Sequence, residues 1–211
     1  MKKIIFVLSS IVITAFSACN NGGSKNEHEG HDMNDMKNDS MTNATATTDS
    51  NIKVITVSFT NVDAKVALSI KEITDQYLRI KNALANDNGN EAANGGKAMA
   101  EAINKLDKSL LTAEQKKVFD FSEESLKEDA EHIGKNADKI KHQREHFATM
   151  SEDVYNLAKA FGAGRELYHV HCPMYNEDKG GAMWLNETKE VKNPFFGAAM
   201  PTCGEVEEVI K

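Results

Sequence analysis

The chain has 211 residues, enough for one domain with its own hydrophobic core and a short appendage. Its formal net charge of −7 argues against the basic surface on which nucleic-acid binding depends, so we expect no nucleic-acid partner. Beyond the N-terminal segment, the sequence contains no apolar run long enough to span a membrane.

The N-terminus has the pattern of a bacterial lipoprotein signal. Lys2 and Lys3 precede the apolar run IIFVLSSIVITAF, and small residues follow up to Cys19. This order is typical of a signal that is removed ahead of a lipid-modified cysteine. We predict a signal peptide over 1–18, lipidation of Cys19 and a membrane anchor in the bacterial cell envelope, facing the periplasm. The alternative is an ordinary signal peptide with an unrelated cysteine.

Residues 19–55 are expected to form a disordered tether. They are rich in Asn, Asp, Ser and Thr and contain few large aliphatic residues, so burial cannot offset the entropy of ordering them. The tether includes a tract with four potential metal ligands: His28, His31, Met33 and Met36. This tract is either a solvated spacer or a weak metal-capture segment.

Residues 56–164 predict a helical bundle. Apolar residues recur at steps of three and four in four segments: 66–84, 99–110, 119–133 and 140–161. Thr112 and Gln115 fit a capping box that opens the third helix. Because the links are short, we predict a mainly α fold with an antiparallel four-helix bundle.

Residues 165–211 differ in composition and predict a small cap. They contain all three prolines and the single tryptophan of the chain. The segments LYHVHC and AMWLN are short enough to be strands, and the turn-like NEDKGG separates them. We therefore expect a short β-hairpin with loops that docks on the bundle.

The cap contains the two cysteines that remain if Cys19 carries lipid. Cys172 and Met174 are two positions apart, so an extended chain projects both side chains to one side. A turn from Met200 to Cys203 brings a second pair of sulfur atoms together. Thiolates and thioethers select soft ions, so these residues predict a Cu(I) site with His171 as a possible fifth ligand. Ag(I) fits equally, and Zn(II) accepts Cys and His but rarely Met.

Two alternatives remain for the same residues. Cys172 and Cys203 can form a structural disulfide, which would stabilise the fold by roughly 2–4 kcal/mol. Disulfide and metal-bound thiolates can also be redox states of one site. A catalytic thiolate–imidazolium pair is the third interpretation, but the sequence offers no orienting carboxylate or oxyanion feature, so we do not expect an enzyme.

Five further residues concern docking and a second metal face. Arg144 falls on the apolar side of its predicted helix and needs a partner, so we expect it to dock the cap together with the cap residue Trp184. His142 and His146 are four residues apart on one helix and form either a metal face or a solvated one. His132 has no companion at a useful spacing and is predicted to lie at the surface.

Several cap motifs resemble an uncharacterised domain family of bacterial envelope proteins. The segments HCPM, GAMWLN, VKNPFFG and MPTCGEV, with QREHF on the fourth predicted helix, are similar to that family over about residues 60–208. The family occurs in lipoproteins and fused to periplasmic adaptor subunits of heavy-metal efflux pumps. The resemblance implies a helical bundle with a metal-linked role and points to these positions: His171, Cys172, Met174, Gly181, Trp184, Asn193, Pro194, Gly197, Met200, Cys203 and Gly204. A looser likeness is to the CPM…CG metal-binding segments of efflux adaptors, whose second half usually has two cysteines where this sequence has one.

Together these observations predict a lipid-anchored envelope protein that binds a soft metal ion, with Cu(I) as the expected ion. Its role would be copper buffering, resistance or delivery to an efflux or metalation partner. The alternative is an envelope protein that binds no metal, acts by protein contact and has a structural disulfide between Cys172 and Cys203.

Overall fold

The computed structural model of the protein describes residues 52–211. The predicted signal peptide, Cys19 and the His/Met tract lie outside the described residues. Within 52–211, no helix is both long enough and apolar enough to cross a membrane.

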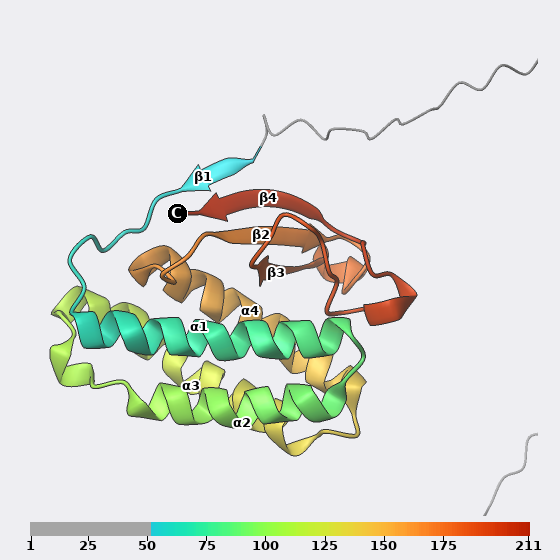
Figure 1. Ribbon diagram of the computed structural model, residues 1–211, viewed down its shortest axis with the longest axis horizontal. Coiled ribbons are helices and arrows are strands. Elements are labelled where there is room, and N and C mark those ends of the chain that lie inside the picture. Colours follow the sequence, from blue (N-terminus) through green and yellow to red (C-terminus); the bar gives the residue numbers. More distant parts are fainter. Residues whose placement is uncertain (1–51) are drawn as a thin grey trace, which may run out of the picture. The chain divides into compact units, whose positions relative to one another are not determined.

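Four helices make up most of the described chain, which confirms the predicted mainly helical fold (Figure 1). They are α1 (Ala64–Ala85), α2 (Gly89–Lys105), α3 (Ala113–Lys135) and α4 (Ile140–Phe161). Each helix packs against the next one in the chain, and α1 also packs against α4. The antiparallel arrangement of the bundle stays a prediction.

Polar residues define where the first three helices begin. The side chain of Asp63 accepts from the backbone N–H of Lys65 at the start of α1, at 2.8 Å. Thr112 and Gln115 form the predicted capping box at the start of α3, with hydrogen bonds of 3.3 and 3.1 Å. These contacts satisfy backbone donors that the first helical turn leaves without partners.

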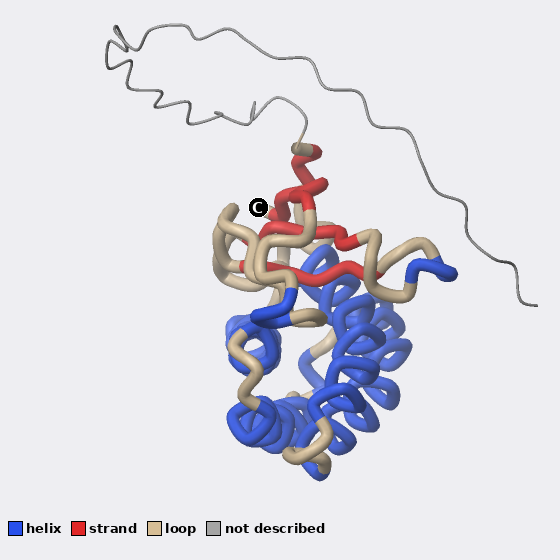
Figure 2. Tube along the Cα trace, turned by 90° about the vertical axis from the view of Figure 1, so that its right-hand side faces the viewer, coloured by secondary structure: helices blue, strands red, loops and turns tan. Residues whose placement is uncertain are grey.

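A four-stranded mixed sheet lies on one side of the helices (Figure 2). Its strands are β1 (Lys53–Ile55), β2 (Leu167–Cys172), β3 (Ala182–Asn186) and β4 (Glu205–Ile210), in the order β1-β4-β2-β3. β1 runs parallel to β4, whereas β2 is antiparallel to both β3 and β4.

The prediction of a simple hairpin with loops was therefore wrong for the cap. The β2–β3 hairpin has the predicted limits, but β4 adds a third strand and β1 a fourth. β1 comes from residues 53–55, which the predicted tether included. Its three residues are too few to show a strand period in the sequence, and its pairing with β4 depends on a contact between distant parts of the chain.

Strand β3 anchors the sheet to α1 through buried polar contacts. The hydroxyl of Tyr77 accepts from the backbone N–H of Leu185 at 2.9 Å. The ammonium of Lys81, which is fully buried, donates to Asn186 and Glu187 at 2.6 Å each. Because the buried donor and acceptors satisfy one another, these polar groups fix the position of the sheet on the helices.

Arg144 of α4 connects the helices with the loop between β3 and β4. Its Nε donates to the carbonyl of Pro194 at 2.8 Å, and its Nη2 donates to the carbonyl of Leu84 at 2.9 Å. The same Nη2 contacts the carboxylate of Asp87 at 2.6 Å. The guanidinium thus bonds to two helix-side groups and one cap carbonyl, which its fork of N–H donors allows.

Candidate functional site

Two cysteines from distant parts of the chain meet in the cap. Cys172 ends β2, and Cys203 lies 31 residues later, just before β4. Their Sγ atoms are 2.7 Å apart, and both are free thiols. Cys172 is fully buried, whereas Cys203 is only partly buried. The pair therefore has a closed side in the core and a side that solvent can reach.

Asn193 shapes the loop that carries Cys203. Its buried side chain donates to the carbonyl of Cys203 at 2.6 Å and accepts from the backbone N–H of Phe195 at 2.7 Å. The backbone N–H of Asn193 donates to the carbonyl of Pro201 at 2.9 Å. A final turn places the N–H of Cys203 3.3 Å from the carbonyl of Met200. These bonds hold the second cysteine against the end of β2.

Burial and, after it, the neighbouring thiol of Cys172 raise the pKa of the Cys203 thiol to about 11. The backbone N–H of Met174 acts in the opposite direction and lowers this pKa. Cys203 is therefore protonated at neutral pH, so binding of a metal ion would release its proton.

The other predicted ligands differ in their positions. The side chains of Met174 and Met200 are 50% and 40% exposed. His171 is engaged elsewhere: its Nε2 lies 2.9 Å from the carbonyl of Gly180, and its Nδ1 lies 3.1 Å from Glu207. Adjacent residues of a strand point to opposite faces, which separates His171 from Cys172. The structure thus brings the two cysteines together but does not bring His171 to them.

Aromatic side chains pack in the core of the cap, next to the loop that carries Cys203. Trp184 on β3 is fully buried and lies edge-on to Phe195, with ring centroids 5.7 Å apart. Phe195 in turn stacks on Tyr175 at 4.4 Å. Gly204 lies directly against Trp184, because a Cβ at this position would come within 2.6 Å of the indole ring. Trp184 is therefore part of the cap core beside Cys203.

A second cluster, which the sequence analysis did not identify, lies between α3 and α4. One ring nitrogen from each of His132, His142 and His146 lies within 4.8 Å of the other two. His132 comes from the last turn of α3, and the other two come from the first turns of α4. We name these three residues the histidine cluster. The spacing of His142 and His146 on one helix was the only signal in the sequence.

Carboxylates surround the histidine cluster. Asp129 lies 2.7 Å from Nδ1 of His146, and Glu145 lies 3.6 Å from Nδ1 of His142. Burial lowers the pKa of His146, and nearby His142 lowers it further, whereas Glu128 and Glu145 raise it. Burial raises the pKa of Asp129 to about 7, and the charge of Asp153 contributes. Burial and acidic neighbours therefore shift the pKa of His146 in opposite directions, and both raise the pKa of Asp129.

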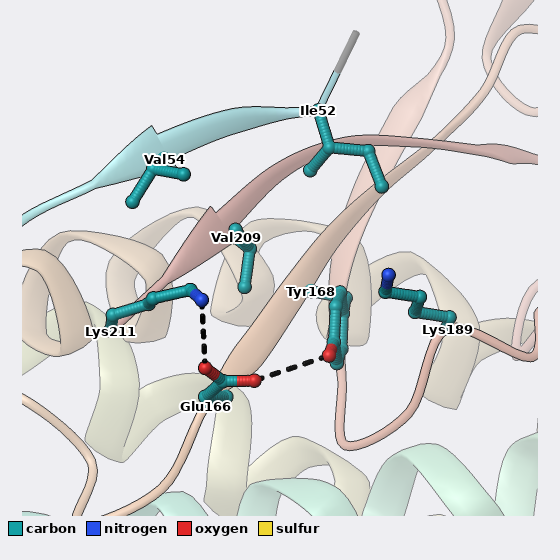
Figure 3. A pocket seen from close by; sticks show the side chains of 7 residues that line it. All are labelled: Ile52, Val54, Glu166, Tyr168, Lys189, Val209 and Lys211. Carbon is teal, nitrogen blue, oxygen red and sulfur yellow. Dashed lines mark hydrogen bonds and ion pairs between the residues drawn. The ribbon is translucent and has the colours of Figure 1, made fainter. Parts of the chain in front are cut away.

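Two hollows border the sheet. One, of about 440 Å³, lies beside His169 and His171. The other, of about 240 Å³, lies over β1, β2 and β4 (Figure 3). In the second hollow, Glu166 pairs with Lys211 at 3.1 Å and accepts from the hydroxyl of Tyr168 at 3.3 Å. Because these three groups already bond to one another, they do not form an open ligand site.

Comparison with known proteins gives one family match. Residues 73–166 match the model of a family described as a protein of unknown function (DUF3347). No curated protein and no solved structure is significantly similar to this chain. The match runs from α1 to the end of α4, so it includes Arg144 and the histidine cluster. It ends before β2 and thus covers neither cysteine.

Proposed function

We propose that this protein binds a soft metal ion, above all Cu(I), at Cys172 and Cys203. The observation that supports the proposal is the 2.7 Å separation of two free thiols that are 31 residues apart in the sequence. Two thiols at one point offer the soft donors that Cu(I) prefers over nitrogen and oxygen. Ag(I) has the same preference and would bind at the same place.

The proposed ligand set is the two cysteines with Met174 and Met200 as thioether donors. Met200 precedes Cys203 by one turn, and the backbone N–H of Met174 contacts the Cys203 sulfur. Both methionines are exposed and unbranched, so their side chains are free to change rotamer when an ion binds. His171 is left out of this set because other groups occupy both of its ring nitrogens.

The surroundings of the thiols favour a protected monovalent ion. Cys172 is fully buried, and the buried rings of Trp184 and Phe195 pack in the same core. Restricted access of water would slow oxidation of Cu(I). The partly buried Cys203 keeps one side open, through which the ion could be passed to another protein.

The proposed location is the bacterial cell envelope. A lipid on Cys19 would anchor the protein, facing the periplasm, and residues 20–51 would let the folded part reach a partner near the membrane. The role would be copper buffering, resistance or delivery to an efflux or metalation protein. Two observations support this assignment: the lipoprotein-like N-terminus and the resemblance of the cap motifs to proteins linked with metal efflux.

A structural disulfide between the same cysteines is the second candidate. The short distance between the two sulfur atoms favours it as well, because thiols in contact are readily joined by an oxidant. In that case the protein would bind no metal in the cap and would act in the envelope through contacts with another protein.

The two candidates can be separated by anaerobic Cu(I) titration of residues 20–211 after reduction, in competition with a chromogenic Cu(I) chelator. The matched variant is Cys172→Ser/Cys203→Ser, and a His28→Gln/His31→Gln/Met33→Leu/Met36→Leu variant controls for binding in the N-terminal tract. We expect one equivalent of tightly bound Cu(I) in the wild type and the tract variant, and its loss in the cysteine variant. If the cysteine variant retains that equivalent, or if the reduced wild type does not compete with the chelator, the cap is not a copper site.

A further inference from the structure

Two rings of the histidine cluster come as close as ligands of one ion. Nδ1 of His132 lies 3.3 Å from Nε2 of His142, which is also within hydrogen-bond range. Two nitrogens that are each about 2.0–2.1 Å from one tetrahedral ion would lie about 3.3–3.4 Å apart. The observed separation therefore already matches a pair of metal ligands.

The third histidine is oriented by a buried carboxylate. Nδ1 of His146 lies 2.7 Å from Oδ1 of Asp129, whose side chain is only 7% exposed. In this contact Nδ1 of His146 can donate a hydrogen bond to Asp129. Nε2 is then the ring nitrogen that can bind an ion. Metal-binding histidines regularly donate their other N–H to a carboxylate in this way. The second oxygen of Asp129 is buried and has no hydrogen-bond partner among the described residues.

His142 shows a weaker form of the same arrangement. Its Nε2 faces His132, while its Nδ1 lies 3.6 Å from Glu145. The ring is 36% exposed, so solvent reaches the cluster from this side. Three nitrogen donors with one open side match the metal sites that keep a fourth position for water or an incoming group.

We propose that His132, His142 and His146 form a second metal site, which takes a divalent ion of the Zn(II) and Cu(II) class with Asp129 as the orienting carboxylate. Imidazole is a ligand of intermediate softness and suits these ions, whereas the cap cysteines suit Cu(I). The site is independent of the cap because it lies between α3 and α4. A bound ion would also join the end of α3 to the start of α4.

A plain structural role explains the cluster less well. His132 and His146 stack with ring centroids 4.2 Å apart, and His142 lies edge-on to both. Stacked rings alone need neither a buried carboxylate beside one of them nor a nitrogen of each ring within 4.8 Å of the other two.

The test is Zn(II) binding to residues 20–211, measured by calorimetry and by competition with a chromogenic chelator. The background carries His28→Gln/His31→Gln and Cys172→Ser/Cys203→Ser, so binding in the tract or the cap cannot contribute. We expect one equivalent of Zn(II) and a rise in Tm that grows with Zn(II) concentration. Co(II) as a probe should give the intense visible absorption of a four-coordinate site.

The matched variants are His132→Gln/His142→Gln and, as a histidine outside the cluster, His171→Gln. We expect the first to weaken Zn(II) binding by at least about 100-fold, and Asp129→Asn by about 10–100-fold, as for other outer-shell carboxylates. His171→Gln should leave the affinity within about threefold, because it removes no proposed ligand. Zn(II) affinity that is unchanged in the double variant would overturn the proposal.

A second measurement leaves the histidine cluster unsubstituted, in case the cluster variants fail to fold. In ¹⁵N spectra of the histidine rings, saturating Zn(II) should shift the metal-bound nitrogens of three residues, and Nδ1 of His146 should remain protonated. Spectra in which Zn(II) leaves these three rings unchanged, while the chain stays folded by circular dichroism, would also overturn the proposal. Because the cysteines are absent from the background, this result does not depend on the copper site.

Discussion

Arg144 and Asp87 form an ion pair of 2.6 Å that ties α4 to the loop after α1. The other carboxylate oxygen of Asp87 accepts from the backbone N–H of Ala198 at 2.9 Å, so the pair also reaches the cap. Gly197 makes this approach possible, because a Cβ there would come within 2.2 Å of the Asp87 carboxylate. The helices and the cap are therefore joined by these polar contacts as well as by apolar packing.

Replacing Arg144 should weaken the connection between cap and helices. In Arg144→Gln, the carbonyls of Leu84 and Pro194 lose their charged donor in a partly buried place. We expect the free energy of unfolding in urea to fall by about 2–3 kcal/mol, the range for hydrogen bonds to a charged group. Arg79→Gln is the control, because its ion pair with Glu91 is solvent-exposed and should contribute little to stability. Equal losses in the two variants would contradict the docking role.

Gly204→Ala should disturb the thiol pair through Trp184. The added methyl group would lie 2.6 Å from the indole ring and 3.0 Å from Val170, and the φ of +143° disfavours any side chain. We expect a loss of about 1–3 kcal/mol, typical of overpacking, and slower disulfide formation between Cys172 and Cys203 under mild oxidant.

A double-mutant cycle with Trp184→Phe checks the cause of this effect. The smaller ring leaves space for the methyl group, so Gly204→Ala should cost less in that background than in the wild type. Additive losses, measured by urea unfolding, would mean that the backbone conformation rather than the indole contact is responsible.

Glu187→Gln should destabilise the protein more than Lys81→Met. The ammonium of Lys81 is fully buried, and Glu187, 2.6 Å away, is its anionic partner. Loss of the carboxylate leaves a buried charge without a counterion, which we expect to cost up to about 3 kcal/mol because Glu187 keeps some exposure. Lys81→Met removes the buried charge and fills similar space. Thermal unfolding of both variants at neutral pH would test the order, and the reverse order would refute the argument.

Stability should fall as the pH decreases below the ordinary pKa of histidine, because of His169. Burial against Tyr155 lowers the pKa of His169 to about 4, although nearby Glu208 opposes the shift. The unfolded chain therefore takes up this proton near pH 6.5 while the folded chain does not, so stability is lost between about pH 6.5 and 4. The loss is at most about 3 kcal/mol for the shift involved.

The measurement is Tm against pH for the wild type and for His169→Gln, which cannot take up the proton. The difference between the two chains should shrink or reverse as the pH falls from 7.5 to 5. Parallel curves over that range would show that His169 does not contribute to the acid sensitivity.

Local sequence patterns predicted the elements of this fold well. The helical stripes over 66–84, 119–133 and 140–161, the capping box at Thr112 and both strands of the β2–β3 hairpin follow from side-chain period and cap chemistry. The stripe over 99–110 was misplaced, because α2 runs from Gly89 to Lys105. These signals are local, because helices and strands are set by neighbouring residues.

The assembly of the candidate sites required the tertiary structure. β1 is a strand only because β4 supplies its hydrogen bonds, and its three residues show no period. His132 looked isolated, since its cluster partners lie on the next helix across a link, where the helical spacing rule does not apply. The sequence by itself determined the mainly helical fold, the β2–β3 hairpin and the two cysteines of the cap. Only the packing of α3 on α4, and of β4 beside β2, decided which chemical groups meet, because such contacts depend on how distant segments bury their apolar faces together.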